Sequence, residues 1–198
     1  MSDEAHRRLA EALRGLLGDL HETVVSTDDA DRLTLAVERF RSDLEAPRRS
    51  AWYDDDPSLS DEARRSGWRD WSLFRGEHQA LAPPLRLERA SDDSGPHIVG
   101  RVTCGRMYEG PPGAVHGGYL AGLFDDMLGA CLSLVDGPSG VTGRLTVRYR
   151  RPTPVETPLE FEARPVDVRA RRFVAAATCR VADTITAEAE ALFVRRPL

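Results

Sequence analysis

The sequence is poor in cysteine and in the residue clusters that hold metal ions. Its three cysteines, Cys104, Cys131 and Cys179, are far apart and form no CxxC pair and no zinc-type spacing. The five histidines also lack the spacing of metal ligands. We therefore expect free thiols, a reducing compartment, and neither a metal nor a redox cofactor.

Two further absences limit the partners of the chain. The longest apolar-rich stretch, residues 119–135, contains Asp125 and Asp126, which make it a poor membrane span and a better buried helix. The first twenty residues carry charges throughout and lack the features of a signal peptide. The 27 basic residues do not outnumber the 32 acidic ones, so nothing favours nucleic acid binding. The sequence predicts a soluble, cytoplasmic protein that binds neither membranes nor nucleic acid.

Signatures of several common chemistries are missing as well. The chain has no GxSxG nucleophile elbow, no Walker phosphate loop, no GxGxxG turn and no HExxH metal motif. Any catalytic site must therefore come from another arrangement of residues.

The chain changes character near residue 75. Leucines recur at helical spacing over residues 3–20, and a second apolar stripe covers residues 33–44 after a cluster of aspartates that can cap a helix. Each helix has one apolar face, which must be covered by the rest of the chain or by a partner. Prolines and glycines over residues 47–75 indicate a connection. We expect a helical N-terminal extension and linker over residues 1–75 and a second domain over residues 76–198.

Strand patterns dominate the second domain, with one helix among them. Two short strands precede an apolar helix from Gly118 to about Val135, and about four strands follow it. In one of these, Leu145, Val147 and Tyr149 alternate with polar residues, as in a half-buried strand. A helix that is apolar almost all round must be enclosed. We therefore predict an α+β fold in which an antiparallel sheet wraps around one long central helix.

The segment from Glu109 to Gly118 leads directly into this helix and ends in His116-Gly117-Gly118. Glycines at a helix start allow close approach to the backbone, and the free N–H groups of the first turn favour negative charge. That environment suits the oxygen of a thioester carbonyl, which gains charge during attack. A tight turn with a structural histidine is the alternative interpretation of the same triplet.

Asp125 lies in the middle of the apolar helix. A carboxylate there is costly unless it is paired or hydrogen-bonded, and burial of this kind can prepare it to act as a general base. Asp126 points about 100° away around the helix, and the periodicity does not decide which of the two acids is exposed. Both could also reach solvent or a partner arginine.

Spacing along the helix bears on how such a site could be assembled. Gly118 and Asp125 are about 10 Å apart along a helix that rises about 1.5 Å per residue. One carbonyl cannot contact both groups of the same helix, because reacting groups must come within about 3 Å. If both act on one thioester, they come from two chains of a symmetric dimer.

Two runs together resemble a known family. The run from His116 to Asp126 and the run from Gly140 to Pro154, which contains Val147-Arg-Tyr-Arg-Arg-Pro152, look like the PaaI-like acyl-CoA thioesterases of the hotdog superfamily. The likeness covers roughly residues 80–198 and implies a hotdog fold. The N-terminal helices lie outside it.

The resemblance also implies roles for single residues. It implies that an amide of Gly117 or Gly118 polarises the thioester carbonyl, that His116 shapes the loop or orients the carbonyl, and that Asp125 acts from the other subunit as base or nucleophile. Thr142 matches a position where relatives carry a Ser or Thr that orients water. Many members have Asn six positions before the histidine, where this chain has Gly110.

Arginines in the strand after the helix are candidates for binding the phosphates of coenzyme A. Arg148, Arg150 and Arg151 could form such a clamp. Alternating arginines are more often the solvent-exposed face of a strand.

The leading hypothesis is a homodimer, or a dimer of dimers, that hydrolyses an acyl-CoA or acyl-carrier thioester. A non-catalytic acyl-CoA-binding or regulatory module of the same fold is the alternative. A hotdog hydratase or dehydratase is a third interpretation, which the acid nine residues after His116 disfavours.

Overall fold

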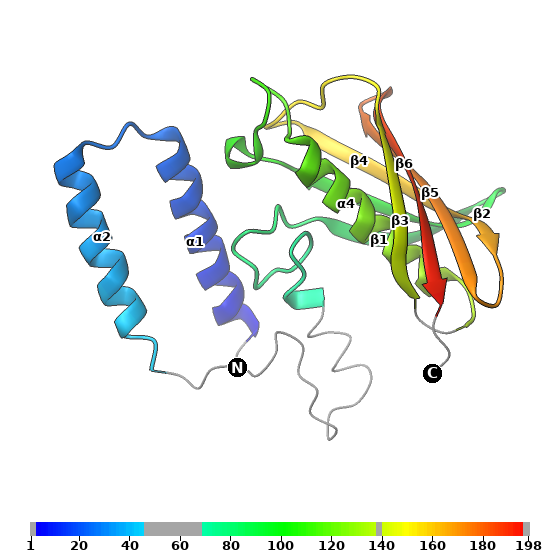
Figure 1. The fold of residues 1–198 in the computed structure, drawn as a ribbon, viewed down its shortest axis with the longest axis horizontal. Coiled ribbons are helices and arrows are strands. Elements are labelled where there is room, and N and C mark those ends of the chain that lie inside the picture. Colours follow the sequence, from blue (N-terminus) through cyan, green and yellow to red (C-terminus); the bar gives the residue numbers. More distant parts are fainter. Residues whose placement is uncertain (1–2, 46–68, 138–139, 196–198) are drawn as a thin grey trace.

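The computed structural model describes residues 3–45, 69–137 and 140–195 (Figure 1). Its C-terminal part is a six-stranded antiparallel sheet in the order β1-β2-β4-β5-β6-β3. The strands are β1 (Arg86–Asp92), β2 (Gly95–Thr103), β3 (Gly140–Tyr149), β4 (Pro158–Val168), β5 (Arg172–Val181) and β6 (Thr184–Arg195). The sheet curves around helix α4 (Gly117–Ala130), so the predicted hotdog fold is confirmed.

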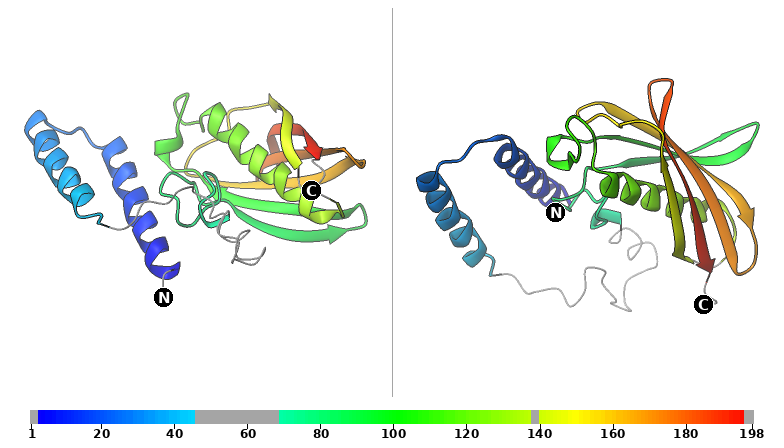
Figure 2. Two further views of the ribbon diagram at one scale, coloured as in Figure 1. Left: turned by 60° about the horizontal axis from the view of Figure 1, so that its bottom comes forward. Right: turned by 45° about the horizontal axis from the view of Figure 1, so that its top comes forward.

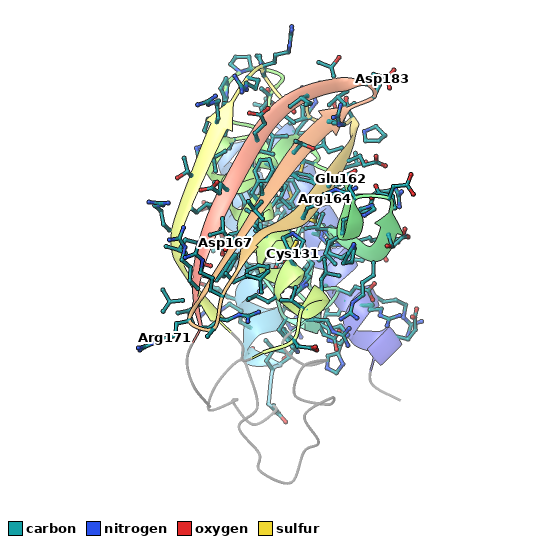
Figure 3. The ribbon with its side chains drawn as sticks, turned by 90° about the vertical axis from the view of Figure 1, so that its right-hand side faces the viewer. Cys131, Glu162, Arg164, Asp167, Arg171 and Asp183 are labelled. Atoms are coloured by element: carbon teal, nitrogen blue, oxygen red, sulfur yellow. The ribbon has the colours of Figure 1, made fainter. Side chains whose placement is uncertain are left out.

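Small side chains on the central strands leave room for this helix. Pairs of inward-facing residues such as Ala175–Ala191 and Ala177–Ala189 form the part of the sheet that α4 approaches. The intervening glutamates of β6, Glu188 and Glu190, lie on the outer face. Small residues on the sheet opposite large ones on the helix allow close packing. Figure 3 shows the sheet from its outer side, with the hairpins that carry Arg171 and Asp183 at opposite ends.

Helix α4 supplies the large residues of the core. Leu120, Leu123, Phe124, Met127 and Leu128 are at most 2% exposed. The ring of Phe124 meets that of Phe161 from β4 edge to face, with centroids 5.2 Å apart. The helix is shorter than predicted, because it ends at Ala130 and continues as the 3-10 helix η2 (Cys131–Leu134). Such tightening of the last turn is common at helix ends.

Two helices form the N-terminal part, which confirms the predicted helical extension. Helices α1 (Asp3–Glu22) and α2 (Thr27–Ser42) form a hairpin in which α1 lies nearer to the C-terminal domain (Figures 1 and 2). Arg14 of α1 donates hydrogen bonds to the carbonyl oxygens of Ala82 (2.7 Å) and Gln79 (3.0 Å). No described helix is long and apolar enough to cross a membrane.

The apolar faces of the two helices are covered only in part. Ala10 of α1 is 3% exposed, whereas Leu16 and Leu20 are about half exposed. No residue of α2 is buried within this chain. The predicted division at residue 75 stays a prediction, and residues 46–68 of the expected connection lie outside the described residues.

The enclosure of α4 predicts a large effect of Phe124→Ala. The substitution removes a fully buried ring that packs on Phe161, so the free energy of unfolding should fall by about 3–5 kcal/mol. Denaturant titration would measure this. Leu35→Ala on α2, where the side chain is 68% exposed, is the control and should change the value by less than about 0.5 kcal/mol. Equal effects of the two substitutions would contradict the packing.

Candidate active site at helix α4

His116 caps the start of α4 with its side chain. Its Nδ1 accepts a hydrogen bond from the Gly118 amide at 3.0 Å, so a neutral ring carries its proton on Nε2. The Gly117 amide has no hydrogen-bond acceptor among the described residues. Of the two glycine amides proposed from the sequence, the one from Gly117 is therefore free to bind an oxygen of a ligand.

The carbonyl of Gly117 is held from the edge strand. Tyr149 of β3 donates a hydrogen bond from its hydroxyl to the Gly117 oxygen at 2.8 Å. This contact fixes the peptide at the start of α4 and links it to one end of β3. In the sequence, Tyr149 is one of the alternating residues of a predicted half-buried strand, and that alternation gives no sign of this hydrogen bond.

The path of the loop before His116 favours glycine at position 110, where many family members have asparagine. The His116 amide donates to the Tyr108 carbonyl at 2.8 Å, where Tyr108 ends the 3-10 helix η1 (Arg106–Tyr108). A Cβ atom on Gly110 would lie only 2.8 Å from the Cα of His116. Glycine at position 110 therefore permits this close passage of the two backbone segments.

Asp125 and Thr142 meet just past the middle of the helix. The Thr142 hydroxyl donates to Oδ1 of Asp125 at 2.8 Å. An irregularity at Gly143 makes this contact possible, because the register of β3 against β6 shifts between Thr142 and Arg144. Strict alternation would place Thr142 on the outer face with Arg144. The bulge turns it inward toward α4, a common effect of bulges near functional sites.

Asp126 faces a different part of the molecule. Its Oδ2 accepts a hydrogen bond from Ser72 at 3.3 Å and lies 3.3 Å from Nε of Arg75. Burial raises the pKa of Asp126, and the nearby Arg75 charge and Ser72 hydroxyl partly oppose that shift. The two acids thus have different partners. Asp126 contacts Ser72 and Arg75, whereas Asp125 accepts a hydrogen bond from Thr142 of the edge strand.

The predicted site residues form two groups within one chain. His116, Gly117 and Gly118 lie at the start of α4, whereas Asp125 lies just past its middle and contacts Thr142 of β3. Gly117 and Asp125 are about 12 Å apart at about 1.5 Å per residue. One small reacting group cannot contact both.

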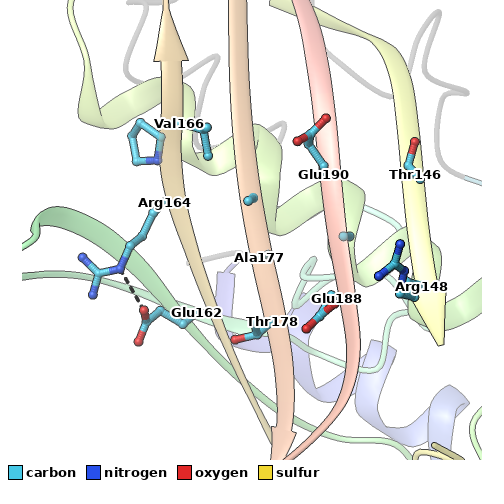
Figure 4. Close-up of a pocket in the computed structure, with 12 residues that line it drawn as sticks. Thr146, Arg148, Glu162, Arg164, Val166, Ala177, Thr178, Glu188 and Glu190 are labelled. Atoms are coloured by element: carbon cyan, nitrogen blue, oxygen red, sulfur yellow. Dashed lines mark hydrogen bonds and ion pairs between the residues drawn. The ribbon is translucent and has the colours of Figure 1, made fainter. Parts of the chain in front are cut away.

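Two hollows on the surface lie away from these groups. A groove of about 730 Å³ crosses the outer face of β3–β6 (Figure 4), and a cleft of about 1150 Å³ separates α1 from β1. Neither is lined by His116, Gly117, Asp125 or Thr142. No group of three or more metal-ligating side chains occurs among the described residues.

The candidate phosphate-binding arginines lie at the end of β3 and directly after it. Arg148 lines the outer groove beside Glu188 (Figure 4). Arg150 donates to the Glu188 carboxylate from Nε (3.0 Å) and Nη2 (2.7 Å). Arg151 is exposed just after the strand. Arg148 and Arg150 thus lie beside the same carboxylate, that of Glu188.

A single helix enclosed by an antiparallel sheet, with a glycine pair at its start, defines a hotdog-fold protein. Residues 112–188 match the family model of the thioesterase superfamily. This part of the chain is therefore similar to proteins of that superfamily.

Known proteins extend the similarity. The acyl-coenzyme A thioesterase THEM4 of Bos taurus is 27% identical over 147 residues, which are 71% of this chain and 56% of the relative. THEM4 of Xenopus laevis is 31% identical over 101 residues, covering 48% and 45% of the two chains. The chain therefore spans about half the length of these curated relatives.

Solved structures agree on the fold. A crystal structure of a thioesterase superfamily protein has a TM-score of 0.76 at 29% identity and covers 96% of this chain and 94% of its own. Zebrafish thioesterase superfamily member 2 has a TM-score of 0.56 at 15% identity and covers 70% of this chain and 100% of its own. The second likeness concerns the fold alone.

The raised pKa of Asp126 predicts a pH-dependent effect of Asp126→Asn. Because the folded protein holds this proton more tightly than the unfolded chain, the contribution of Asp126 to stability falls as pH rises through its folded pKa. The unfolding free energy of the variant minus that of the wild type should therefore increase as pH rises above about 4, the pKa of Asp in an unfolded chain. Denaturant titrations at several pH values would measure it.

Asp183→Asn, the same substitution at an exposed hairpin residue, is the control for the pH dependence of the difference in unfolding free energy. A difference for Asp126→Asn that stays constant or decreases with pH would contradict the assigned direction.

Proposed function

We propose that the protein hydrolyses acyl-CoA thioesters to a free acid and coenzyme A. The proposal depends on two groups that occur on the same helix. One is the Gly117 amide, which has no acceptor among the described residues, and the other is the Asp125 carboxylate, which accepts a hydrogen bond from the Thr142 hydroxyl. The superfamily match and the THEM4 relatives support the substrate class.

The start of α4 supplies the electrostatic part of the reaction. The Gly117 amide would donate a hydrogen bond to the thioester oxygen, which becomes negative as the carbonyl carbon is attacked. The helix dipole adds to this stabilisation. His116 holds the loop through its Nδ1 contact with Gly118, and Tyr149 holds the Gly117 peptide from the opposite side.

Asp125 and Thr142 supply the proton transfer. With Oδ1 bound to the Thr142 hydroxyl, Oδ2 of Asp125 would accept a proton from water, and the resulting hydroxide attacks the carbonyl carbon. The carbon–sulfur bond then breaks, and the proton passes to the thiolate of coenzyme A. Thr142 would orient the water through the lone pairs of its oxygen. Direct attack by Asp125 through an anhydride is the variant of this step.

A symmetric dimer would bring the two groups together. β3 is an edge strand of the sheet, and Val141 and Tyr149 near its two ends are about half exposed. Exposed edges favour pairing with another strand. If two β3 strands pair antiparallel about a twofold axis, the Thr142 end of one lies beside the Tyr149 end of the other. Asp125 of one protomer then approaches Gly117 of its partner.

The first test is Asp125→Asn on a panel of short, long and aromatic acyl-CoAs, with thiol release as the readout. The variant should lose about 10²- to 10⁴-fold in kcat, because amide nitrogen cannot take the proton. Asp183→Asn, the same change on a distant hairpin, should retain activity. Wild-type kcat in the Asp125 variant would contradict the assignment. Binding of acyl-CoA without any thiol release by the wild type would favour the regulatory module instead.

The oxyanion role can be tested with a substitution that removes the amide hydrogen of residue 117. Proline is accepted at the first position of a helix, and His116 has the extended conformation (φ −58°, ψ 130°) that precedes proline. Gly117→Pro should therefore keep the helix start, lose the amide proton and lower kcat about 10²- to 10³-fold. Gly117→Ala, which keeps the N–H but places a Cβ 3.3 Å from the Tyr149 hydroxyl, is the matched control. Equal activity of the two variants would exclude the amide.

Mixing the two inactive variants tests the shared site. When Asp125→Asn and Gly117→Pro subunits are co-refolded in equal amounts, half of the dimers are mixed and each mixed dimer holds one intact site. About a quarter of wild-type activity should return. Absence of recovery, with mixed dimers demonstrated by a tag on one subunit, would contradict the shared site but leave the hydrolase proposal standing.

A further inference from the structure

Helix α4 is contacted on its outer side by a short segment of the same chain that precedes the hotdog sheet. We name residues Ser72–Gly76 the α4 brace. Phe74 of the brace packs against Gly122, where a Cβ atom would lie 1.9 Å from the ring. The same ring meets Tyr119 edge to face at 6.2 Å. Tyr119, Gly122 and Asp126 follow one another at helical spacing, so the brace covers one stripe of α4.

The polar contacts of the brace converge on one oxygen. Both Ser72 Oγ and Arg75 Nε lie 3.3 Å from Oδ2 of Asp126. The N–H at Nε of Arg75 makes no hydrogen bond, so its attraction for the Asp126 carboxylate is that of a nearby charge. The side chain of Asp126 is 17% exposed and that of Arg75 is 26% exposed. Removing the partner of such a poorly solvated charge has a large cost.

The backbone of the brace is closed as a tight turn. The Gly76 amide donates to the Ser72 carbonyl at 2.9 Å, and a Cβ atom on Gly76 would lie 2.5 Å from that oxygen. The Leu85 amide donates to the Phe74 carbonyl at 3.1 Å, which ties the brace to the start of the sheet domain. The brace is therefore anchored at both α4 and the sheet domain.

We propose that Arg75 and Ser72 are positioning residues for the reaction, and that the α4 brace, acting with the packed inner face of the helix, fixes the fine rotation of α4 about its axis. Asp126 and Asp125 are adjacent in sequence, so a rotation that moves one moves the other. The Thr142 contact of Asp125 is a single hydrogen bond of 2.8 Å from an edge strand, so the brace adds a second polar restraint to the apolar packing of the inner helix face. Misplacement of a reacting group by about 1 Å can cost about 10²-fold in rate.

The expected effects on kcat rest on the proposed function of Asp125. Arg75→Met removes the charge but keeps an apolar stem, and should lower kcat about 10- to 100-fold with KM changed by less than about twofold. Arg75→Lys restores a charge near Oδ2 and should stay within about threefold of the wild type. Gly76→Ala opens the turn without altering a charge and should resemble Arg75→Met.

Arg101→Met is the matched control. Arg101 is also ion-paired, with Glu88 at 2.8 Å, but lies on β2. The kcat of the Arg101→Met variant should equal that of the wild type.

Hydrogen exchange provides a readout that does not need turnover. In Arg75→Met and Gly76→Ala, amides of α4 should exchange about tenfold faster or more, while those of β5 and β6 keep their rates. Unchanged α4 exchange in both variants would overturn the proposal, whether or not kcat falls, since the effect on rate would then come from elsewhere. A wild type that hydrolyses no thioester would defeat the proposed function, and exchange alone would still decide the role of the brace.

Discussion

The packing of α4 against the inner face of the sheet is the contact on which the rest of the molecule depends. Alanines at positions such as 175, 177, 189 and 191 lie opposite the leucines, Phe124 and Met127 of the helix. With this face of the helix buried, the remaining faces have fixed directions. One carries Asp125 toward β3 and another carries Asp126 toward the α4 brace. The chemistry of each acid follows from that orientation, because adjacent helical residues point about 100° apart.

The edge strand β3 connects the two ends of the helix. Tyr149 holds the Gly117 peptide, and Thr142 reaches Asp125 through the bulge at Gly143. The same strand leaves one edge of the sheet without a neighbour in this chain. A strand that positions both halves of the candidate site and also offers an edge for pairing gives a physical reason to propose that catalysis and dimer formation are linked.

Much of the fold could be predicted from the sequence. Alternation over Leu145, Val147 and Tyr149 and the continuous apolar character of the helix indicated an enclosed helix in an antiparallel sheet, and the structure confirms it. The helical spacing of apolar residues also indicated helices before residue 45. Their degree of burial was not predictable, because an amphipathic pattern identifies the apolar face but not its partner. The half-exposed Leu16 and the absence of any buried residue in α2 illustrate the difference.

The sequence by itself determined the candidate chemistry: a glycine pair at a helix start, two carboxylates in an apolar helix, and too great a spacing for one chain to unite them. The tertiary structure decided which atoms are available. It paired Asp126 with Arg75 and Ser72, directed the Gly118 amide to His116, and turned Thr142 inward by a one-residue bulge. Periodicity cannot hold this information, because each outcome depends on residues distant in the sequence and on a local break in the strand repeat.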